Sequence, residues 1–171
     1  MRSILLAFLL LSNSHANLSD INSFEADFEQ VVKDDKDKVI GYKGTVIATK
    51  PQNALWNYTI PVDKMVYINS VNVTIIEPEI EQVMIKKIES DFNLFEMISH
   101  AKKSGPNSYV AQYHDSKFTI IVEKEKLKSI HYKDEFENSV DIYFYNQKQN
   151  QPIDAKRFTP AIPVNYDILK D

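Results

Sequence analysis

The sequence of 171 residues lacks cysteine altogether and contains only three glycines. Without cysteine, the fold has neither disulfide bonds nor thiolate ligands for a metal ion. Three glycines are too few for glycine-rich phosphate-binding loops, so most turns must be formed by Asn, Asp, Lys and Pro. A chain of this length can bury one hydrophobic core without such supports, and we expect a single domain.

An excess of positive charge is also missing. The chain has 20 Lys and Arg residues against 24 Asp and Glu residues, which gives a net charge of −4. Both signs are interspersed along the sequence. A nucleic-acid-binding protein needs a concentrated basic face, so this class of protein is excluded.

Catalytic and metal-binding motifs are absent as well. His100, His114 and His131 have no second histidine at metal-ligand spacing, so we expect no metal and no cofactor. Residues 114–116 read His-Asp-Ser, but these side chains are adjacent in a predicted turn, whereas a catalytic triad is assembled across a fold. The glutamates of residues 77–81 surround a proline and indicate a solvated edge rather than a glycosidase pair. We therefore expect no enzymatic activity.

The one extended apolar run lies at the N-terminus. Arg2 is followed by apolar residues 4–11 and then by Ser14-His15-Ala16, a small-x-small site. This order is typical of a secretory signal peptide, and the run is too short to span a bilayer. We predict a signal peptide over residues 1–16, cleaved after Ala16, and one exported domain over residues 17–171.

The remaining chain is a series of short β-type runs. Between Gly44 and Val83 these runs consist of Val, Ile, Thr, Tyr or Trp and are bounded by Pro, Asn, Asp or Ser, a pattern typical of antiparallel strands. In residues 24–30, Phe and Ala alternate with acidic side chains, so one face of an extended segment is apolar. Further strands are predicted at residues 109–113, 118–122, 127–132 and 140–145.

One segment has a different period. In residues 91–101 apolar side chains recur at intervals of three and four, the first turn is acidic, and Gly105-Pro106 follows as a stop signal, which predicts a short amphipathic helix. The charged residues 34–38 predict a hairpin end, and the stretch around Phe158 shows no regular pattern. The residues alone thus predict a strongly curved antiparallel sheet with one or two short helices.

Two segments in the first half of the chain follow the pattern of a known family. Residues 23–30 read Ser-Phe-Glu-Ala-Asp-Phe-Glu-Gln, which is similar to the family's Phe-x-Ala-x-Phe-x-Gln start. Gly44 then leads to Lys50-Pro51, to Trp-Asn-Tyr at residues 56–58 and to Pro61. The family has a glycine, two basic residues with a proline, Trp-x-Tyr and a proline in this order.

Two further segments extend the match toward the C-terminus. Residues 77–83 read Glu-Pro-Glu-Ile-Glu-Gln-Val, similar to the family's Tyr-Asp-Pro-x-Leu-x-Gln-Val. Residues 158–167 read Phe-Thr-Pro-Ala-Ile-Pro-Val-Asn-Tyr-Asp and resemble its tail. On these four segments, which occur in the family's order, the chain resembles the outer-membrane lipoprotein carrier family (LolA), periplasmic chaperones that carry lipoproteins from the inner to the outer membrane.

The resemblance implies a fold, a function and partners. The fold is mainly β with short helices: an incomplete, open antiparallel β-barrel with a helical lid. Its hydrophobic cavity binds the acyl chains of lipoproteins in the periplasm of a Gram-negative bacterium. The implied partners are acylated lipoprotein cargo, an inner-membrane ABC transporter that releases lipoproteins, and an outer-membrane receptor lipoprotein. The protein is expected to act as a monomer.

Twelve residues are candidates for lining this cavity, and the alternative for each is a place in an ordinary core. The candidates are Phe24, Phe28, Val46, Ala54, Trp56, Tyr58, Tyr67, Ile75, Met84, Leu94, Phe95 and Met97.

Lys50 occupies the position of a residue that closes the lid in the family. There, an arginine immediately before the proline hydrogen-bonds to backbone carbonyls of the lid and holds the empty cavity shut. Lys50 has three donors on a flexible stem instead of a planar fork, so it cannot form the same bidentate contact. The resemblance therefore implies Lys50 as the lid latch, with altered geometry.

A second hypothesis for the function stays open. The same open barrel can serve as a periplasmic domain that senses lipids or lipoproteins, or as an adaptor domain, without transport. A carrier binds an acylated lipoprotein in a soluble complex, whereas an adaptor binds a protein partner through its rim and ignores acyl chains.

Overall fold

The computed structural model describes residues 18–88, 94–113 and 115–170. Within these residues, twelve strands form one sheet. The strands are β1 (Ser23–Lys33), β2 (Val39–Thr49), β3 (Asn53–Ile60), β4 (Lys64–Ile68), β5 (Asn72–Glu77), β6 (Gln82–Lys87), β7 (Lys102–Lys103), β8 (Ser108–Tyr113), β9 (Ser116–Glu123), β10 (Lys126–Lys133), β11 (Ser139–Gln149) and β12 (Asp167–Lys170). The helical elements are α1 (Leu94–Ser99) and three 3₁₀ turns, η1 (Leu18–Asp20), η2 (Pro78–Ile80) and η3 (Ala155–Phe158).

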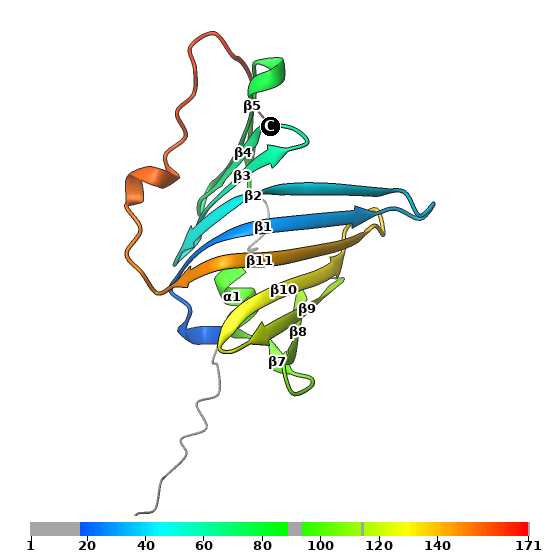
Figure 1. Ribbon diagram of the computed structural model, residues 1–171. Coiled ribbons are helices and arrows are strands. Elements are labelled where there is room, and N and C mark those ends of the chain that lie inside the picture. The colour runs from blue at the N-terminus through cyan, green and yellow to red at the C-terminus, as the bar shows by residue number, and fades with distance from the viewer. Residues whose placement is uncertain (1–17, 89–93, 114, 171) are drawn as a thin grey trace, which may run out of the picture.

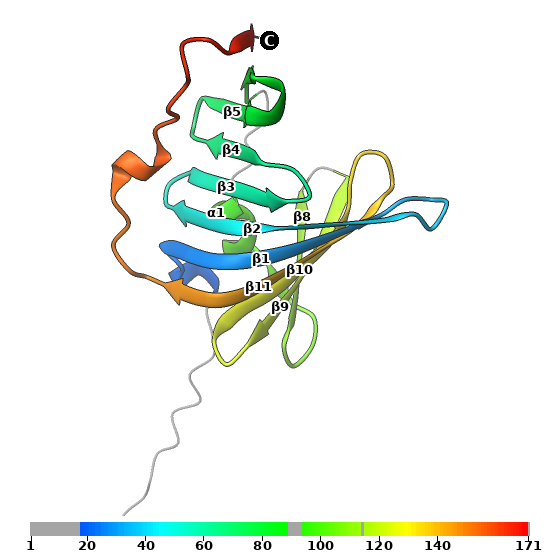
Figure 2. The same ribbon diagram turned by 45° about the horizontal axis from the view of Figure 1, so that its top comes forward.

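The sheet is strongly curved and open (Figures 1 and 2). Its strand order is β12-β6-β5-β4-β3-β2-β1-β11-β10-β9-β8-β7, so β12 and β7 form the two edges. Neighbouring strands are antiparallel except β12, which runs parallel to β6. The predicted fold class, an open antiparallel β-barrel with few helices, is confirmed.

Strand β1 joins the two halves of the sheet. It pairs with β2 through the hairpin at residues 34–38 and with β11, far along the chain. The predicted alternation is present, because Phe24, Ala26 and Phe28 are buried on the concave side while Asp27 is exposed. At the hairpin end, the Asp34 carboxylate accepts hydrogen bonds from two backbone N–H groups of the loop. Local sequence therefore determines both this strand and its turn.

Helix α1 lies inside the curve of the sheet (Figure 2). The prediction placed a helix over residues 91–101; the structure has helix over Leu94–Ser99, and residues 91–93 lie outside the described part. Phe95, Met97 and Ile98 are buried against the core, which explains the apolar spacing. After the last turn, the backbone N–H of His100 donates to the carbonyl of Glu96. No helix in the described residues is long and apolar enough to cross a membrane.

The C-terminal segment runs along the outside of the sheet after β11 and returns to its edge (Figure 1). The predicted irregular stretch around Phe158 contains η3, which begins where the Asp154 side chain accepts a hydrogen bond from the backbone N–H of Lys156. Ile47, Ile76 and Val83 are buried on this outer side, apart from the main core. The parallel strand β12 that follows was not predicted, because its four residues show no apolar-polar alternation in the sequence.

Both edges of the sheet are short strands. Strand β7 consists of two exposed lysines, Lys102 and Lys103. Strand β12 begins at Asp167, ends at Lys170 and is exposed along its whole length. Neither edge presents a long apolar strand to solvent.

Candidate functional site

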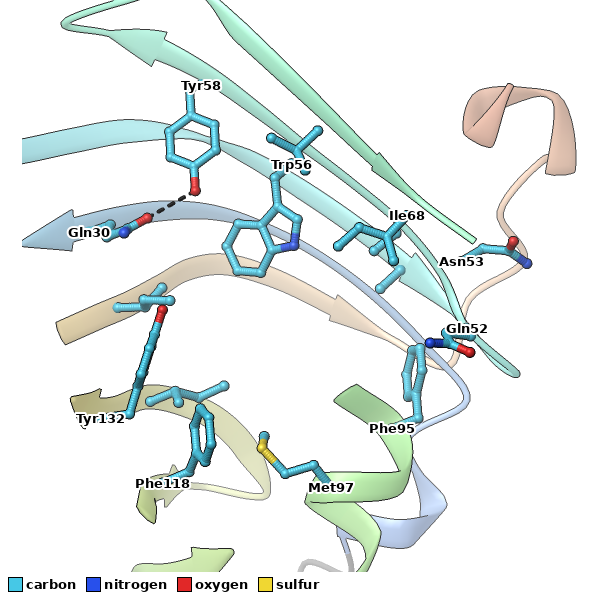
Figure 3. A pocket seen from close by; sticks show the side chains of 15 residues that line it. Gln30, Gln52, Asn53, Trp56, Tyr58, Ile68, Phe95, Met97, Phe118 and Tyr132 are labelled. Carbon is cyan, nitrogen blue, oxygen red and sulfur yellow. Dashed lines mark hydrogen bonds between the residues drawn. The ribbon is translucent and has the colours of Figure 1, made fainter. Parts of the chain in front are cut away.

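A pocket of about 270 Å³ lies between the concave face of the sheet and α1 (Figure 3). Most of its wall is apolar, and a few amides and hydroxyls interrupt it. Such a composition is typical of a site for a small, largely apolar ligand. The lining residues are Gln30, Ala48, Gln52, Asn53, Ala54, Trp56, Tyr58, Val66, Ile68, Phe95, Met97, Phe118, Ile130, Tyr132 and Ile142.

The walls come from both halves of the sheet. Trp56 and Tyr58 project from β3, and Phe118 and Tyr132 project from β9 and β10 on the other side (Figure 3). Met97 reaches into the space between them from α1 (Figure 3). Alternate residues of a strand share a face, so a single strand provides only part of the wall: Ala54, Trp56 and Tyr58 come from β3, and the facing side chains come from other strands. The pocket therefore forms only when the two halves are joined by β1.

Aromatic packing fixes the positions of the wall residues. The Phe28 ring is edge-on to both Trp56 and Tyr58, with ring centroids 5.0 Å apart in each pair. On the other wall, Phe118 and Tyr132 stack with centroids 4.9 Å apart. Edge-to-face and offset-stacked rings are favourable arrangements that also restrict side-chain rotation. The pocket is thus held by rigid rather than flexible side chains.

Five of the predicted cavity residues line the pocket: Ala54, Trp56, Tyr58, Phe95 and Met97.

The other predicted residues lie elsewhere. Phe24, Phe28 and Val46 belong to the buried core behind the pocket wall. Ile75 and Met84 pair with each other and lie on the same face as Val66, but they are not part of the lining. The side chain of Leu94 is not among those that the structure describes.

Tyr67 must be removed from the cavity set. It pairs with Leu55, whereas its neighbour Val66 pairs with Trp56 and lines the pocket. Because side chains alternate across a strand, Tyr67 points to the outer face. The aromatic character of Tyr67 suggested a role in the cavity, but the pairing register of β3 and β4 determines which face of the sheet its side chain occupies.

Two groups of lining residues were not predicted from the sequence. One group is apolar and comes mainly from the second half of the chain: Ala48, Val66, Ile68, Phe118, Ile130, Tyr132 and Ile142. The sequence indicated that such residues alternate along strands, but it did not indicate which of them lie near Trp56. The other group is polar and comprises Gln30, Gln52 and Asn53. Polar residues of strands and turns are usually assigned to the solvent side, so no sequence signal identified these three.

Tyr58 is one of two ionisable side chains in the pocket wall, together with Tyr132. Its hydroxyl donates a hydrogen bond to Gln30 Oε1 at 3.0 Å (Figure 3). Burial raises the pKa of Tyr58 to about 12, with smaller contributions from Tyr132 and Tyr42. Burial also raises the pKa of Tyr132. Both hydroxyls therefore remain neutral at any physiological pH.

The raised pKa of Tyr58 predicts a loss of stability in alkaline solution. The folded state favours the neutral phenol, so the stabilisation is complete below the unfolded pKa of 10.0 and is lost as pH rises through about 12. The free energy of unfolding should fall by up to about 1.4 kcal/mol per pH unit in this window. Urea denaturation at several alkaline pH values measures the slope. The slope should be smaller in Tyr58→Phe, and equal slopes would contradict the prediction.

Lys50 connects the start of the domain to the sheet. Its Nζ donates to the backbone carbonyl of Ser19 in η1 at 2.8 Å, and its backbone N–H donates to the carbonyl of Asn22 at 2.9 Å. The 3₁₀ turn η1 also contacts α1. The implied latch residue therefore bonds to one backbone carbonyl, and it does so on the N-terminal turn beside the helix rather than on α1 itself.

A hydrogen-bonded chain on the outer face was also missed. Ser129 Oγ lies 2.7 Å from His131 Nε2, and His131 Nδ1 lies 2.6 Å from Asp141 Oδ1. The three have the order of a Ser-His-Asp triad, but Ser129 is only 3% exposed and a nucleophile must reach its substrate. These hydrogen bonds form a side-chain contact between the neighbouring strands β10 and β11. Among the described residues, no three His, Asp or Glu side chains could share a metal ion.

The fold and the pocket define a class of protein: an open, curved antiparallel sheet with a mostly apolar pocket between its concave face and a short helix. Within this class, the chain belongs to the LolA family, since the family model described as outer membrane lipoprotein carrier protein LolA matches residues 19–112. The resemblance found in the sequence is thereby confirmed.

Curated relatives match the chain along nearly its whole length. A protein of Campylobacter jejuni is 37% identical over 169 residues, which cover 99% of each chain. A protein of Wolinella succinogenes is 28% identical over 156 residues, which cover 91% of each chain. Both relatives are named outer-membrane lipoprotein carrier protein.

Solved structures share the fold at low sequence identity. An uncharacterized conserved protein from Thermus thermophilus has a TM-score of 0.55 and 10% identity, with 91% of this chain and 94% of that chain covered. A LolA superfamily protein from Nitrosomonas europaea has a TM-score of 0.50 and 11% identity, with 82% and 91% covered. These similarities concern the fold alone.

Proposed function

We propose that the protein is a lipoprotein carrier, which binds the acyl chains of lipoproteins in the concave pocket and carries them from the inner to the outer membrane. The observation that supports this most is the mostly apolar pocket between the sheet and α1. It occurs in a chain whose relatives are named outer-membrane lipoprotein carrier protein. Acyl chains in water expose a large apolar surface, and a soluble carrier must cover part of it.

The pocket is expected to shield the acyl chains only in part. Burying a chain of about fifteen methylenes is worth roughly 12 kcal/mol at about 0.8 kcal/mol each. Three fully buried chains would exceed the ceiling of about 18–21 kcal/mol observed for non-covalent binding. A pocket volume of about 270 Å³ also limits how much chain can enter. Partial shielding keeps the binding weak enough for release.

The proposed route requires export and membrane partners. We assign residues 1–16, which lie outside the described residues, to a signal peptide, and residues 17–171 to one periplasmic domain. An inner-membrane ABC transporter would supply the energy that extracts the lipoprotein, and an outer-membrane receptor lipoprotein would accept it. The carrier would act as a monomer and catalyse no reaction.

Release of lipoprotein from membranes tests this function. Inner-membrane vesicles that contain the transporter and a radiolabelled triacylated lipoprotein are incubated with the protein and ATP. The labelled lipoprotein is expected in the soluble fraction, co-eluting with the carrier at a ratio of one to one. If the label stays in the vesicles while the protein still binds a periplasmic protein partner, the adaptor function replaces the carrier function.

Replacing Lys50 with leucine is expected to slow the delivery of cargo. We propose that the contact between Lys50 and the Ser19 carbonyl holds η1 in place beside α1 and so favours the closed pocket. A hydrogen bond of this kind contributes about 1 kcal/mol to the closed, empty state of the pocket. Its loss should shift the equilibrium between the empty and the occupied pocket roughly fivefold toward the occupied one. Transfer of lipoprotein from the purified complex to receptor-containing membranes measures the effect.

Lys50→Arg is the matched control for this variant, because it keeps a cationic donor at the same position. Its transfer rate should stay near that of the wild type. Wild-type transfer by Lys50→Leu would show that other contacts close the pocket.

A further inference from the structure

The pocket wall contains one polar pair whose position suggests a chemical role. Gln30 lies on β1 between Phe28 and Val32, which both face the core side of the sheet. Strand alternation therefore directs the Gln30 carboxamide toward the pocket rather than toward solvent. Gln30 is half-buried, and its Nε2 is not fully enclosed by protein atoms, so the amide can be reached by a ligand in the pocket.

Only half of this carboxamide is paired within the protein. The Tyr58 hydroxyl donates to Gln30 Oε1 at 3.0 Å. Gln30 Nε2 makes no hydrogen bond with any of the described residues. A phenol is a good donor and a poor acceptor, and an amide oxygen is a good acceptor, so this pairing leaves the NH₂ group as the free end.

The surroundings of Tyr58 fix the direction of this free end. The Tyr58 ring is edge-on to Phe28 and to Tyr42, with centroids 5.0 Å and 5.9 Å away. Lys64 Nζ lies 4.6 Å from the centroid of the same ring. These three contacts restrict the position of the Tyr58 ring and therefore of its hydroxyl. The hydroxyl orients the Gln30 carboxamide through their hydrogen bond. The donor is thus preorganised, which reduces the loss of conformational entropy on binding.

The pair lies at one end of the pocket. Figure 3 shows Gln30 and Tyr58 at the opposite end from Phe95 and Met97 of α1, with Trp56 between them. The wall between the two ends is mainly apolar. An elongated amphiphile would therefore place its polar linkage at Gln30 and its hydrocarbon along Trp56 toward α1.

We propose that Gln30, oriented by Tyr58, donates a hydrogen bond to the carbonyl oxygen that links an acyl chain to its head group. The inference rests on the proposed function, because it concerns the ligand of the same pocket. A carbonyl is what distinguishes an acyl chain from an alkyl chain of equal length, so Gln30 makes the pocket selective for acyl groups. Tyr58 acts as a positioning residue and does not itself contact the ligand.

Matched ligands that differ only in the linkage test the proposal. A fluorescent apolar probe is bound to the purified protein and displaced by a dipalmitoyl glycerol ester, by its dihexadecyl ether or by an N-palmitoyl amide. One neutral hydrogen bond should give the ester a roughly three- to tenfold advantage over the ether. The amide arm shows whether an N-linked carbonyl is recognised as well as an O-linked one.

Three variants locate the source of the selectivity. Gln30→Leu should bind the ether at least as well as the wild type and should lose the preference for the ester. Tyr58→Phe keeps the ring and removes the hydroxyl, so its preference should be reduced. Gln82→Leu is the matched control, since Gln82 is a half-buried glutamine of β6 that does not line the pocket, and its ester preference should equal that of the wild type.

The outcomes separate this inference from the proposed function. Equal displacement by ester and ether in the wild type overturns the carbonyl subsite while leaving acyl-chain binding intact. An ester preference that persists in a folded Gln30→Leu variant also overturns it, because another group must then recognise the carbonyl. Failure of all three ligands to displace the probe contradicts the proposed function itself. Thermal unfolding of each variant establishes that it is folded.

Discussion

Replacing Gly44 with alanine is expected to destabilise the fold more than any other single methyl addition in β2. A Cβ atom at this position would lie 2.0 Å from the backbone oxygen of Asn57 and 3.0 Å from Cε1 of Phe28. The close approach occurs where the pairing of β2 with β3 shifts register between Lys43 and Gly44. Backbone atoms cannot move aside as a flexible side chain can, and overpacking of this kind costs about 3 kcal/mol or more. Urea denaturation of Gly44→Ala measures the loss.

Gly41 provides the matched control in the same strand. A Cβ atom added at Gly41 would meet no atom within 4 Å. Gly41→Ala should therefore be neutral or stabilising by about 0.5–1 kcal/mol, because alanine loses less backbone entropy than glycine on folding. If Gly44→Ala were as stable as Gly41→Ala, β3 would have to lie farther from β2 than the structure shows.

Introducing a carboxylate into the pocket through Trp56→Glu is expected to abolish the release of lipoprotein from inner-membrane vesicles. The charge would face the acyl chains across an apolar wall, where no described residue is placed to neutralise it, and an unpaired buried charge is strongly unfavourable. Release in the vesicle assay should fall at least roughly tenfold, since a loss of about 1.4 kcal/mol already has this effect.

Two further variants make the result interpretable. Phe136→Glu adds the same charge at a residue that is 74% exposed and does not line the pocket, and it should release lipoprotein normally. Trp56 also packs on Phe28 and Phe144, so loss of the indole can weaken the core. Ile68→Glu places the charge in the pocket from β4 without removing an aromatic contact. Normal release by folded Ile68→Glu and Trp56→Glu would show that acyl chains bind elsewhere.

Local sequence was sufficient to predict most of the strands and their assembly into a curved antiparallel sheet, whereas the open barrel was implied by the family resemblance. The alternation of Phe24, Ala26 and Phe28 with acidic residues identified β1 and its buried face. The hairpin at residues 34–38 followed from its charged composition, and α1 followed from its helical spacing. Each of these features depends on neighbours within a few residues, which is the range that periodicity covers.

The composition of the pocket could not be predicted in the same way. Tyr67 and Val66 are adjacent in sequence, yet only Val66 lines the pocket, because the pairing of β4 with β3 sets which face each occupies. Phe118 and Tyr132 reach the pocket only because β1 pairs with β11 and so brings the second half of the chain opposite β3. Long-range register, unlike alternation, is not encoded in any short window.

The partner of Lys50 illustrates the same limit. The family resemblance implied a contact with backbone carbonyls of a lid, and nothing in the sequence indicates that the acceptor would belong to Ser19. A hydrogen bond over this separation depends on where η1 lies after the sheet has formed. Such contacts can be located only in the folded molecule.

The short edge strands have a consequence for how the protein behaves among its own copies. A closed barrel has no free edges, whereas a sheet that stays open to admit a ligand exposes unpaired backbone groups that can recruit strands from other molecules. Here one edge is the Lys102–Lys103 pair, and the other is the exposed β12, which begins at Asp167 and ends at Lys170. Charge and shortness both oppose intermolecular strand addition. The two edges that the open barrel leaves unpaired are therefore protected from aggregation by strand addition.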